Sequence, residues 1–248
     1  MIHLRSLPDW QNVGVQRRPN LGVELAVVAL LLVVFDWVAG LASLRAGAAY
    51  ANGRELLTPF DVELRADHWF ATVHWLHVPA ALYYDFAHIN ITLVTLLACW
   101  WWRPQVYRRA RAALVLVSVA GLITFYCYPV APPRLLPHGG FVDIVAQSGT
   151  WGSSPSSPTH ANAFGSMPSL HAAWAIWVAV TVMAATENRW LRRLGWLHVA
   201  LTLVITVLTG NHYLIDLAAG AASLAVAWRV TAPRTVSQEV PSVSAGAH

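Results

Sequence analysis

Two histidines and one aspartate have residue types and spacing that suit covalent catalysis, with phosphorus as a candidate target. His212 and Asp216 lie four residues apart, so in a helix they would share one face, and the carboxylate could accept a hydrogen bond from one imidazole nitrogen. That bond fixes the tautomer and leaves the other nitrogen free to attack phosphorus, which gives a phosphohistidine. His171 is a second imidazole, suited to protonate the leaving oxygen and later to activate the acceptor. These three residues are the predicted catalytic set.

The residues around this set predict a phosphate site. Arg134 is the only arginine between residues 131 and 168, and its planar guanidinium can bind two phosphate oxygens. Pro168 suits the first turn of a helix, where a missing N–H group costs nothing, and Ser169 can add a hydroxyl. The free amides of a helix start also favour phosphate. The predicted substrate-binding residues are Arg134, Pro168, Ser169, Gly210 and Asn211.

Long apolar helices must hold these residues in place. Of the 248 residues, 56% are hydrophobic and 11% are charged, whereas a soluble domain has about 25% charged residues. About twenty apolar residues cross a bilayer as a helix. We therefore predict an all-α integral membrane protein with six transmembrane helices. The predicted spans are residues 21–41, 79–102, 112–130, 169–186, 194–210 and 213–230.

The arginines predict the orientation of these spans. The chain has no lysine, and twelve of its sixteen arginines precede the first span or follow the second, fourth and sixth. Because positive residues favour the cytoplasmic side, we expect both termini in the cytoplasm and the active site on the periplasmic or extracellular side. Residues 42–78 mix charged residues with Leu and Trp, which is typical of interfacial helices on the outer face.

The domain organisation is simple. We expect a cytoplasmic N-terminal segment of residues 1–20, one membrane domain of residues 21–232 and a disordered cytoplasmic tail of residues 233–248. The pair Arg17 and Arg18 before an apolar run resembles a secretory signal. However, no convincing small-residue cleavage site follows at the right distance, so we expect this run to remain as the first span in the inner or plasma membrane.

Several other partners are not expected. The net charge of +4 does not indicate nucleic-acid binding, because the arginines lie between apolar runs rather than along one face. His74 and His77 are three residues apart, but no third ligand has the spacing of a zinc site. We therefore predict no metal and no other cofactor, with a lipid phosphate and the membrane lipids as the partners.

Three short strings together resemble the type 2 phosphatidic acid phosphatase superfamily over about residues 83–222. They are Ala-Pro-Pro-Arg at 131–134, Ser-Met-Pro-Ser-Leu-His at 166–171 and Gly-Asn-His-Tyr-Leu-Ile-Asp at 210–216. The resemblance implies a six-helix membrane fold and no required metal. It also implies that His212 is the nucleophile, Asp216 its partner, His171 the general acid and Arg134 a phosphate ligand.

The sequence departs from the motifs of that superfamily at two cations. Cys127 stands where the first motif has lysine, and Thr206 stands where the third motif has arginine. The strings resemble more the branch with inositol phosphorylceramide synthases, whose members transfer a phosphoryl headgroup between lipids. The acceptor is then either water or a hydroxyl group, and we hypothesise that Arg65, His138 or His160 supplies the missing charge.

Two other functions are compatible with the sequence. The site could belong to a lipid carrier that lacks the chemistry, or Asp36, Asp85 and Asp216 could relay ions or protons through a transporter. The order of the histidine and aspartate motifs at one face favours the enzyme. His88 breaks the apolar second span, and it either faces the site or packs within the bundle.

Overall fold

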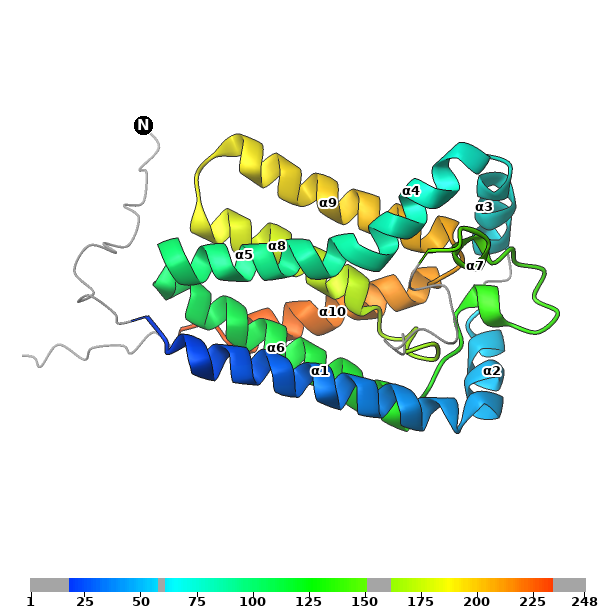
Figure 1. Cartoon of the computed structure of the whole chain (residues 1–248), viewed down its shortest axis with the longest axis horizontal. Helices are drawn as coiled ribbons and strands as arrows, with labels where there is room; N and C mark the ends of the chain where they lie inside the picture. The colour runs from blue at the N-terminus through cyan, green and yellow to red at the C-terminus, as the bar shows by residue number, and fades with distance from the viewer. Residues whose placement is uncertain (1–17, 58–60, 151–161, 234–248) are drawn as a thin grey trace, which may run out of the picture.

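The computed structural model describes residues 18–57, 61–150 and 162–233, which form helices and no strand (Figure 1). This confirms the all-α prediction. The predicted N-terminal segment and C-terminal tail fall almost wholly outside the described residues. The long helices are α1 (Leu21–Ser43), α5 (His88–Trp102), α6 (Pro104–Cys127), α8 (Leu170–Ala185), α9 (Arg189–Leu208) and α10 (Leu214–Val230).

Local sequence signals set the starts of several of these helices. Asn20 caps α1, where its side chain accepts from the backbone N–H of Gly22 at 2.8 Å. Asn188 caps α9 in the same way, with a bond of 2.9 Å from the backbone N–H of Trp190. Pro104 begins α6, where its missing N–H group is tolerated.

Four helical segments are long and apolar enough to cross a bilayer, as judged by length and composition. They are Leu21–Ser43, His74–Trp102, Pro104–Cys127 and Arg189–Leu208. The apolar helix α8 has 16 residues and α10 has 17, so each is about 25 Å long at about 1.5 Å per residue. The hydrocarbon core is about 30 Å thick. Four of the six predicted spans thus have the expected dimensions, and the other two stay predictions.

Three spans begin earlier than predicted, and the fifth begins at Arg189 rather than residue 194. The third begins at Pro104 rather than residue 112, because helical arginines find partners inside the protein. Arg111 pairs with Glu24 of α1 at 2.5 Å, and Arg109 donates to the Trp228 carbonyl at 2.9 Å. The second span is a continuous helical run from His74, in which α4 (His77–Leu82) leads into a π-helical turn, η3 (Tyr83–Ala87), and then into α5.

Helix α8 lies at the centre of the bundle. It packs against α5, α6, α9 and α10, and its alanines at 172, 173, 175 and 179 are buried. Small side chains let neighbouring helices approach closely in a membrane. Trp177 on the same helix is fully buried and donates to the Ala110 carbonyl of α6 at 2.7 Å. The large apolar side chains of α1, in contrast, mostly face outward.

The two ends of the bundle differ. The start of α1, the α5–α6 and α8–α9 links and the end of α10 lie at one end (Figure 1). The starts of α8 and α10 point to the other end, where α2 (Ala46–Glu55), α3 (Val62–Ala71) and α7 (Ile144–Gln147) lie. Buried Glu63 joins α3 to the bundle, because its Oε1 accepts from the Leu214 backbone N–H at 3.2 Å. The interfacial location predicted for residues 42–78 stays a prediction.

Candidate active site

The link between α9 and α10 carries the predicted nucleophile. Gly210 turns the chain with φ of +61°, and α10 begins at Leu214 with Tyr213 as its N-cap. His212 therefore precedes the helix, which differs from the expectation that it shares a helical face with Asp216. The two side chains still meet, with His212 Nδ1 3.3 Å from Asp216 Oδ2. They meet because Asp216 is in the first turn and its carboxylate points back toward the link.

The Asp216 carboxylate is fully buried and well supported. Its Oδ2 accepts from the Ser166 hydroxyl and from the Tyr213 backbone N–H, the latter at 3.1 Å. Because a carboxylate oxygen accepts hydrogen bonds, Nδ1 of His212 carries the hydrogen in this contact. Nε2 of His212 is then left with its lone pair, as a nucleophilic imidazole requires.

His171 lies directly against that lone pair. Its Nδ1 is 3.2 Å from His212 Nε2, and the two ring centroids are 5.2 Å apart with the rings inclined at 63°. Because His212 Nε2 carries the lone pair, His171 Nδ1 carries the hydrogen and is the donor in this contact. The structure therefore brings the predicted nucleophile, its carboxylate partner and the predicted acid into one chain of contacts.

Close packing of α8 on α10 produces this arrangement. A Cβ atom added to Gly220 would lie 2.2 Å from the Ser169 carbonyl oxygen, so only glycine allows the approach. The Ser169 backbone N–H also donates to the Asp216 carbonyl at 3.0 Å.

The Ser169 hydroxyl caps α8 by accepting from the Ala172 backbone N–H at 3.2 Å. Pro168 precedes this cap and so lies outside the first turn, unlike our expectation. Both Pro168 and Ser169 are buried.

Arg134 is held beside this link by the residues that precede His212. It lies in a short 3₁₀ turn, η4 (Pro133–Leu135), and its backbone N–H donates to the Gly210 carbonyl at 2.9 Å. Its Nε donates to Asn211 Oδ1 at 2.8 Å, and its Nη1 pairs with Asp143 Oδ2 at 2.8 Å. Gly210 and Asn211 thus orient the guanidinium that is expected to bind phosphate.

A protein-family model described as the PAP2 superfamily matches residues 55–230, which is more than half of the chain. The chain belongs to the PAP2 superfamily. The match includes every predicted site residue, and PAP2 membership supports a membrane phosphatase or phosphotransferase that acts on a lipid phosphate. No curated protein and no solved structure shows significant similarity to the chain.

The sequence lacks the lysine and the arginine that the PAP2 motifs lead one to expect. The residues at those two positions differ in burial. Cys127 is exposed at the end of α6, whereas Thr206 is buried in α9. Of the proposed substitutes, Arg65 and His138 have exposed side chains, and His160 lies outside the described residues. Their part in charge compensation stays a hypothesis.

Three polar residues near this PAP2 site were not among the predicted site residues. Ser166 donates to Asp216, and Asp143 pairs with Arg134. The third, Asp67, is fully buried and accepts from the Val142 backbone N–H at 2.8 Å. Burial raises the pKa of Asp67, although this hydrogen bond opposes the shift. Ser166 is the first residue of the string at 166–171, which is a signal in the sequence, but nothing in the sequence distinguishes Asp67.

The histidine pair weighed as a zinc site has other contacts. His77 is buried, and its Nε2 lies 3.0 Å from the Phe70 carbonyl, while His74 is exposed. In the part of the chain that the structure describes, no group of three or more His, Cys, Asp or Glu residues could hold a metal ion.

Proposed function

We propose that this PAP2 protein transfers phosphate from a membrane lipid through a phosphohistidine on His212. The observation that carries the proposal is the 3.2 Å contact between His171 Nδ1 and His212 Nε2, on an imidazole whose other nitrogen faces buried Asp216. A nucleophile with an orienting carboxylate and an adjacent proton donor is the arrangement that covalent catalysis uses. Asp216 would also stabilise the positive charge that forms on the His212 ring.

The proposed reaction has two steps. In the first, His212 Nε2 forms a bond to phosphorus as the bond to the lipid oxygen breaks. That oxygen takes a proton from the imidazolium form of His171, which becomes neutral. In the second, His171 removes a proton from the acceptor, whose oxygen attacks phosphorus and releases His212. Arg134 would stabilise charge on the phosphoryl oxygens in both steps.

The charge distribution supports an outward-facing site. Nine of the twelve arginines belong to the described residues, at or near the start of α1, the α5–α6 and α8–α9 links and the end of α10. If all six long helices cross the bilayer, these elements share one side, because they meet at one end of the bundle (Figure 1). His171 and His212 belong to the opposite end. Since arginines favour the cytoplasmic side, we propose that both termini are cytoplasmic and that the lipid phosphate enters from the periplasmic or extracellular leaflet.

Transfer of a phosphoryl headgroup, such as phosphoinositol, is the second candidate. Cys127 and Thr206 replace two cations of the family motifs, so the site carries less positive charge. A phosphomonoester carries a charge of about −1.5 to −2 near neutral pH, whereas the phosphodiester of a lipid headgroup carries a single negative charge. The lower positive charge therefore suits a phosphodiester donor and a hydroxyl acceptor, as in the inositol phosphorylceramide synthase branch.

Phosphate release by the purified protein in mild detergent would test the proposal. The substrates would be polyprenyl phosphates and diphosphates, phosphatidate and lysophosphatidate, with His212→Ala alongside and His74→Ala as a control on an exposed histidine. We expect release by wild type and by the control, no release by His212→Ala, and inhibition by orthovanadate, which mimics pentacoordinate phosphorus.

The alternatives give different results in the same preparation. Headgroup transfer predicts product only when phosphatidylinositol and a hydroxyl acceptor are both supplied, as mass spectrometry would show. A lipid carrier predicts no product, together with lipid movement that His171→Ala leaves unchanged. Activity of folded His212→Ala on every substrate of the wild type would refute the phosphohistidine.

A further inference from the structure

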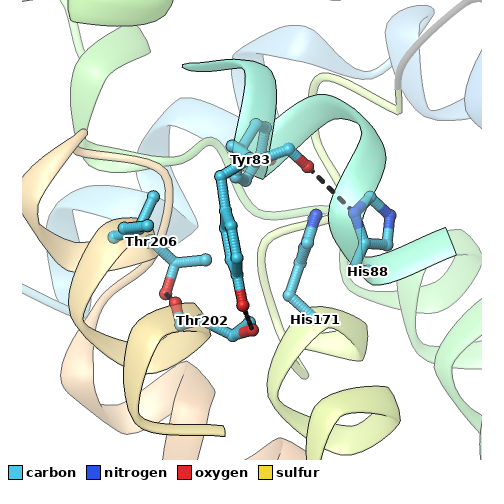
Figure 2. Close-up of a pocket in the computed structure, with 7 residues that line it drawn as sticks. Tyr83, His88, His171, Thr202 and Thr206 are labelled. Carbon is cyan, nitrogen blue, oxygen red and sulfur yellow. Dashed lines mark hydrogen bonds between the residues drawn. The ribbon is translucent and has the colours of Figure 1, made fainter. Parts of the chain in front are cut away.

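The π-helical turn Tyr83–Ala87 brings a third histidine to the site. Extra residues in such a turn shift the side chains that follow it, and π-turns in α-helices are frequent at functional sites. His88 follows the turn directly, and its Nδ1 lies 2.9 Å from the Tyr84 carbonyl (Figure 2). Because a carbonyl oxygen can only accept, His88 Nδ1 carries the hydrogen and its ring is fixed in orientation.

Two aromatic rings from this segment hold His171. The Tyr84 ring is stacked on the His171 ring, with centroids 4.6 Å apart and planes inclined at 20°. The His88 ring is closer still, at 4.1 Å between centroids and 55° between planes. Figure 2 shows His88 and Tyr83 with His171 in the pocket that they line. His171 thus contacts aromatic rings from this helix and His212 from the link before α10.

The space between these rings is closed. The pocket is lined by Tyr83, Tyr84, His88 and His171, together with Thr202, Ile205 and Thr206 of α9. It has no room for a water molecule. Ring-to-ring contact therefore restrains His171 directly. Rotation of the His171 ring toward this side is opposed by packing, which directs its Nδ1 toward His212.

We propose that His88 is a positioning residue that keeps His171 directed at the leaving oxygen. The inference rests on the proposed phosphohistidine mechanism and adds a residue outside the three motif strings. His88 is not required to donate or accept a proton in the reaction. It acts through the face of its ring, and the hydrogen bond to Tyr84 fixes that ring in place.

A pair of substitutions separates the two features of His88. His88→Asn keeps a donor near the position of Nδ1 for the Tyr84 carbonyl, but removes the ring that contacts His171. His88→Phe keeps a ring against His171 and removes the donor. If His88 positions His171, His88→Phe retains more activity than His88→Asn. If His88 only stabilises the helix through its hydrogen bond, the order is reversed.

The assay uses two substrates with different leaving groups and the same alkyl tail, an alkyl phosphate and an alkyl-substituted nitrophenyl phosphate. A nitrophenolate leaves without much protonation, whereas an alkoxide needs the proton from His171. General acid catalysis is worth about 10²- to 10⁴-fold. We expect His88→Asn to lower kcat/KM about 10- to 100-fold on the alkyl phosphate, with a change of less than about threefold on the nitrophenyl ester. His74→Asn, on the same helical run, should match wild type on both.

Each result has a distinct meaning. Equal losses on both substrates, or wild-type behaviour of His88→Asn, would refute the positioning role. If His88→Asn does not fold, Tyr84→Leu removes the stacked ring instead and should give the same dependence on leaving group. If wild type and His212→Ala are equally active on both substrates, the proposed function fails and the inference falls with it. An active wild type, an inactive His212→Ala and insensitive His88 variants overturn the inference alone.

Discussion

Replacing Asp216 with asparagine tests the centre of the proposed mechanism. The substitution keeps the size of the side chain and an oxygen that can accept from Tyr213 and Ser166. It removes the negative charge beside His212. It can also place an amide N–H against His212 Nδ1, which would move the imidazole hydrogen to Nε2. The nucleophilic lone pair would then face away from phosphorus.

The size of the effect follows from the geometry. Nδ1 of His212 and Oδ2 of Asp216 are 3.3 Å apart, and Asp216 is fully buried. Two unit charges at that distance attract by about 5 kcal/mol with an effective dielectric constant of about 20. Since about 1.4 kcal/mol corresponds to a factor of ten in rate, loss of this attraction to the cationic His212 ring lowers kcat by about 10³- to 10⁴-fold.

The measurement is single-turnover and steady-state phosphate release with the substrate that wild type prefers. Asp61→Asn, at an exposed position just before α3, is the matched control and should leave kcat unchanged. Thermal unfolding in detergent would establish that Asp216→Asn is folded. A folded Asp216→Asn protein with kcat within tenfold of wild type would contradict the proposed orientation of His212.

Two further substitutions test the packing around Gly210, near which Asp67 and Arg134 both lie. Gly210 and Gly149 have φ of +61° and +63°, so alanine at either costs about 1–2 kcal/mol. A Cβ at Gly210 would also meet the Arg134 Cβ at 3.2 Å, whereas one at Gly149 meets nothing within 4 Å. Gly210→Ala should therefore lower the unfolding temperature more than Gly149→Ala does, and it should also raise KM. Equal decreases in unfolding temperature for the two variants would contradict the contact between position 210 and Arg134. Because burial raises the pKa of Asp67 above 3.8, its charge opposes folding, and stability rises as pH falls through the raised pKa toward 3.8. Asp67→Asn should unfold at a higher temperature than wild type at pH 7, with a difference that shrinks toward pH 4, and a lower temperature at pH 7 would refute this.

The sequence was most informative about residues that lie in short motifs at the ends of apolar segments. The His171, His212 and Asp216 contacts could be predicted because each motif lies at the end of an apolar segment, and parallel or antiparallel packing brings such ends together. Arg134 could be placed near them for the same reason. The sixth span was predicted from residue 213, within one residue of the helix start at Leu214. The helical face shared by His212 and Asp216 was wrong, because the turn at Gly210 leaves His212 outside the helix.

Other features depend on packing that the sequence does not encode in a local pattern. The spacing of apolar residues does not reveal the π-helical turn at Tyr83–Ala87, because apolar residues occur on several sides of this helical segment. The approach of α8 to α10 depends on Gly220, which looks like any other glycine of a membrane helix. The early start of α6 depends on Glu24 and Trp228, which lie far away in sequence and satisfy arginines that appeared to terminate the span.

The hydrogen bond between His171 and His212 also bears on how the enzyme rests between turnovers. In the proposed mechanism, the lone pair that would attack phosphorus already accepts a hydrogen bond from His171, and no phosphoryl group fits between atoms 3.2 Å apart. A substrate must separate the two rings before it can react. If His212 is the nucleophile, this hydrogen bond masks it from other electrophiles between turnovers, and it would become available only when a lipid phosphate replaces the hydrogen bond.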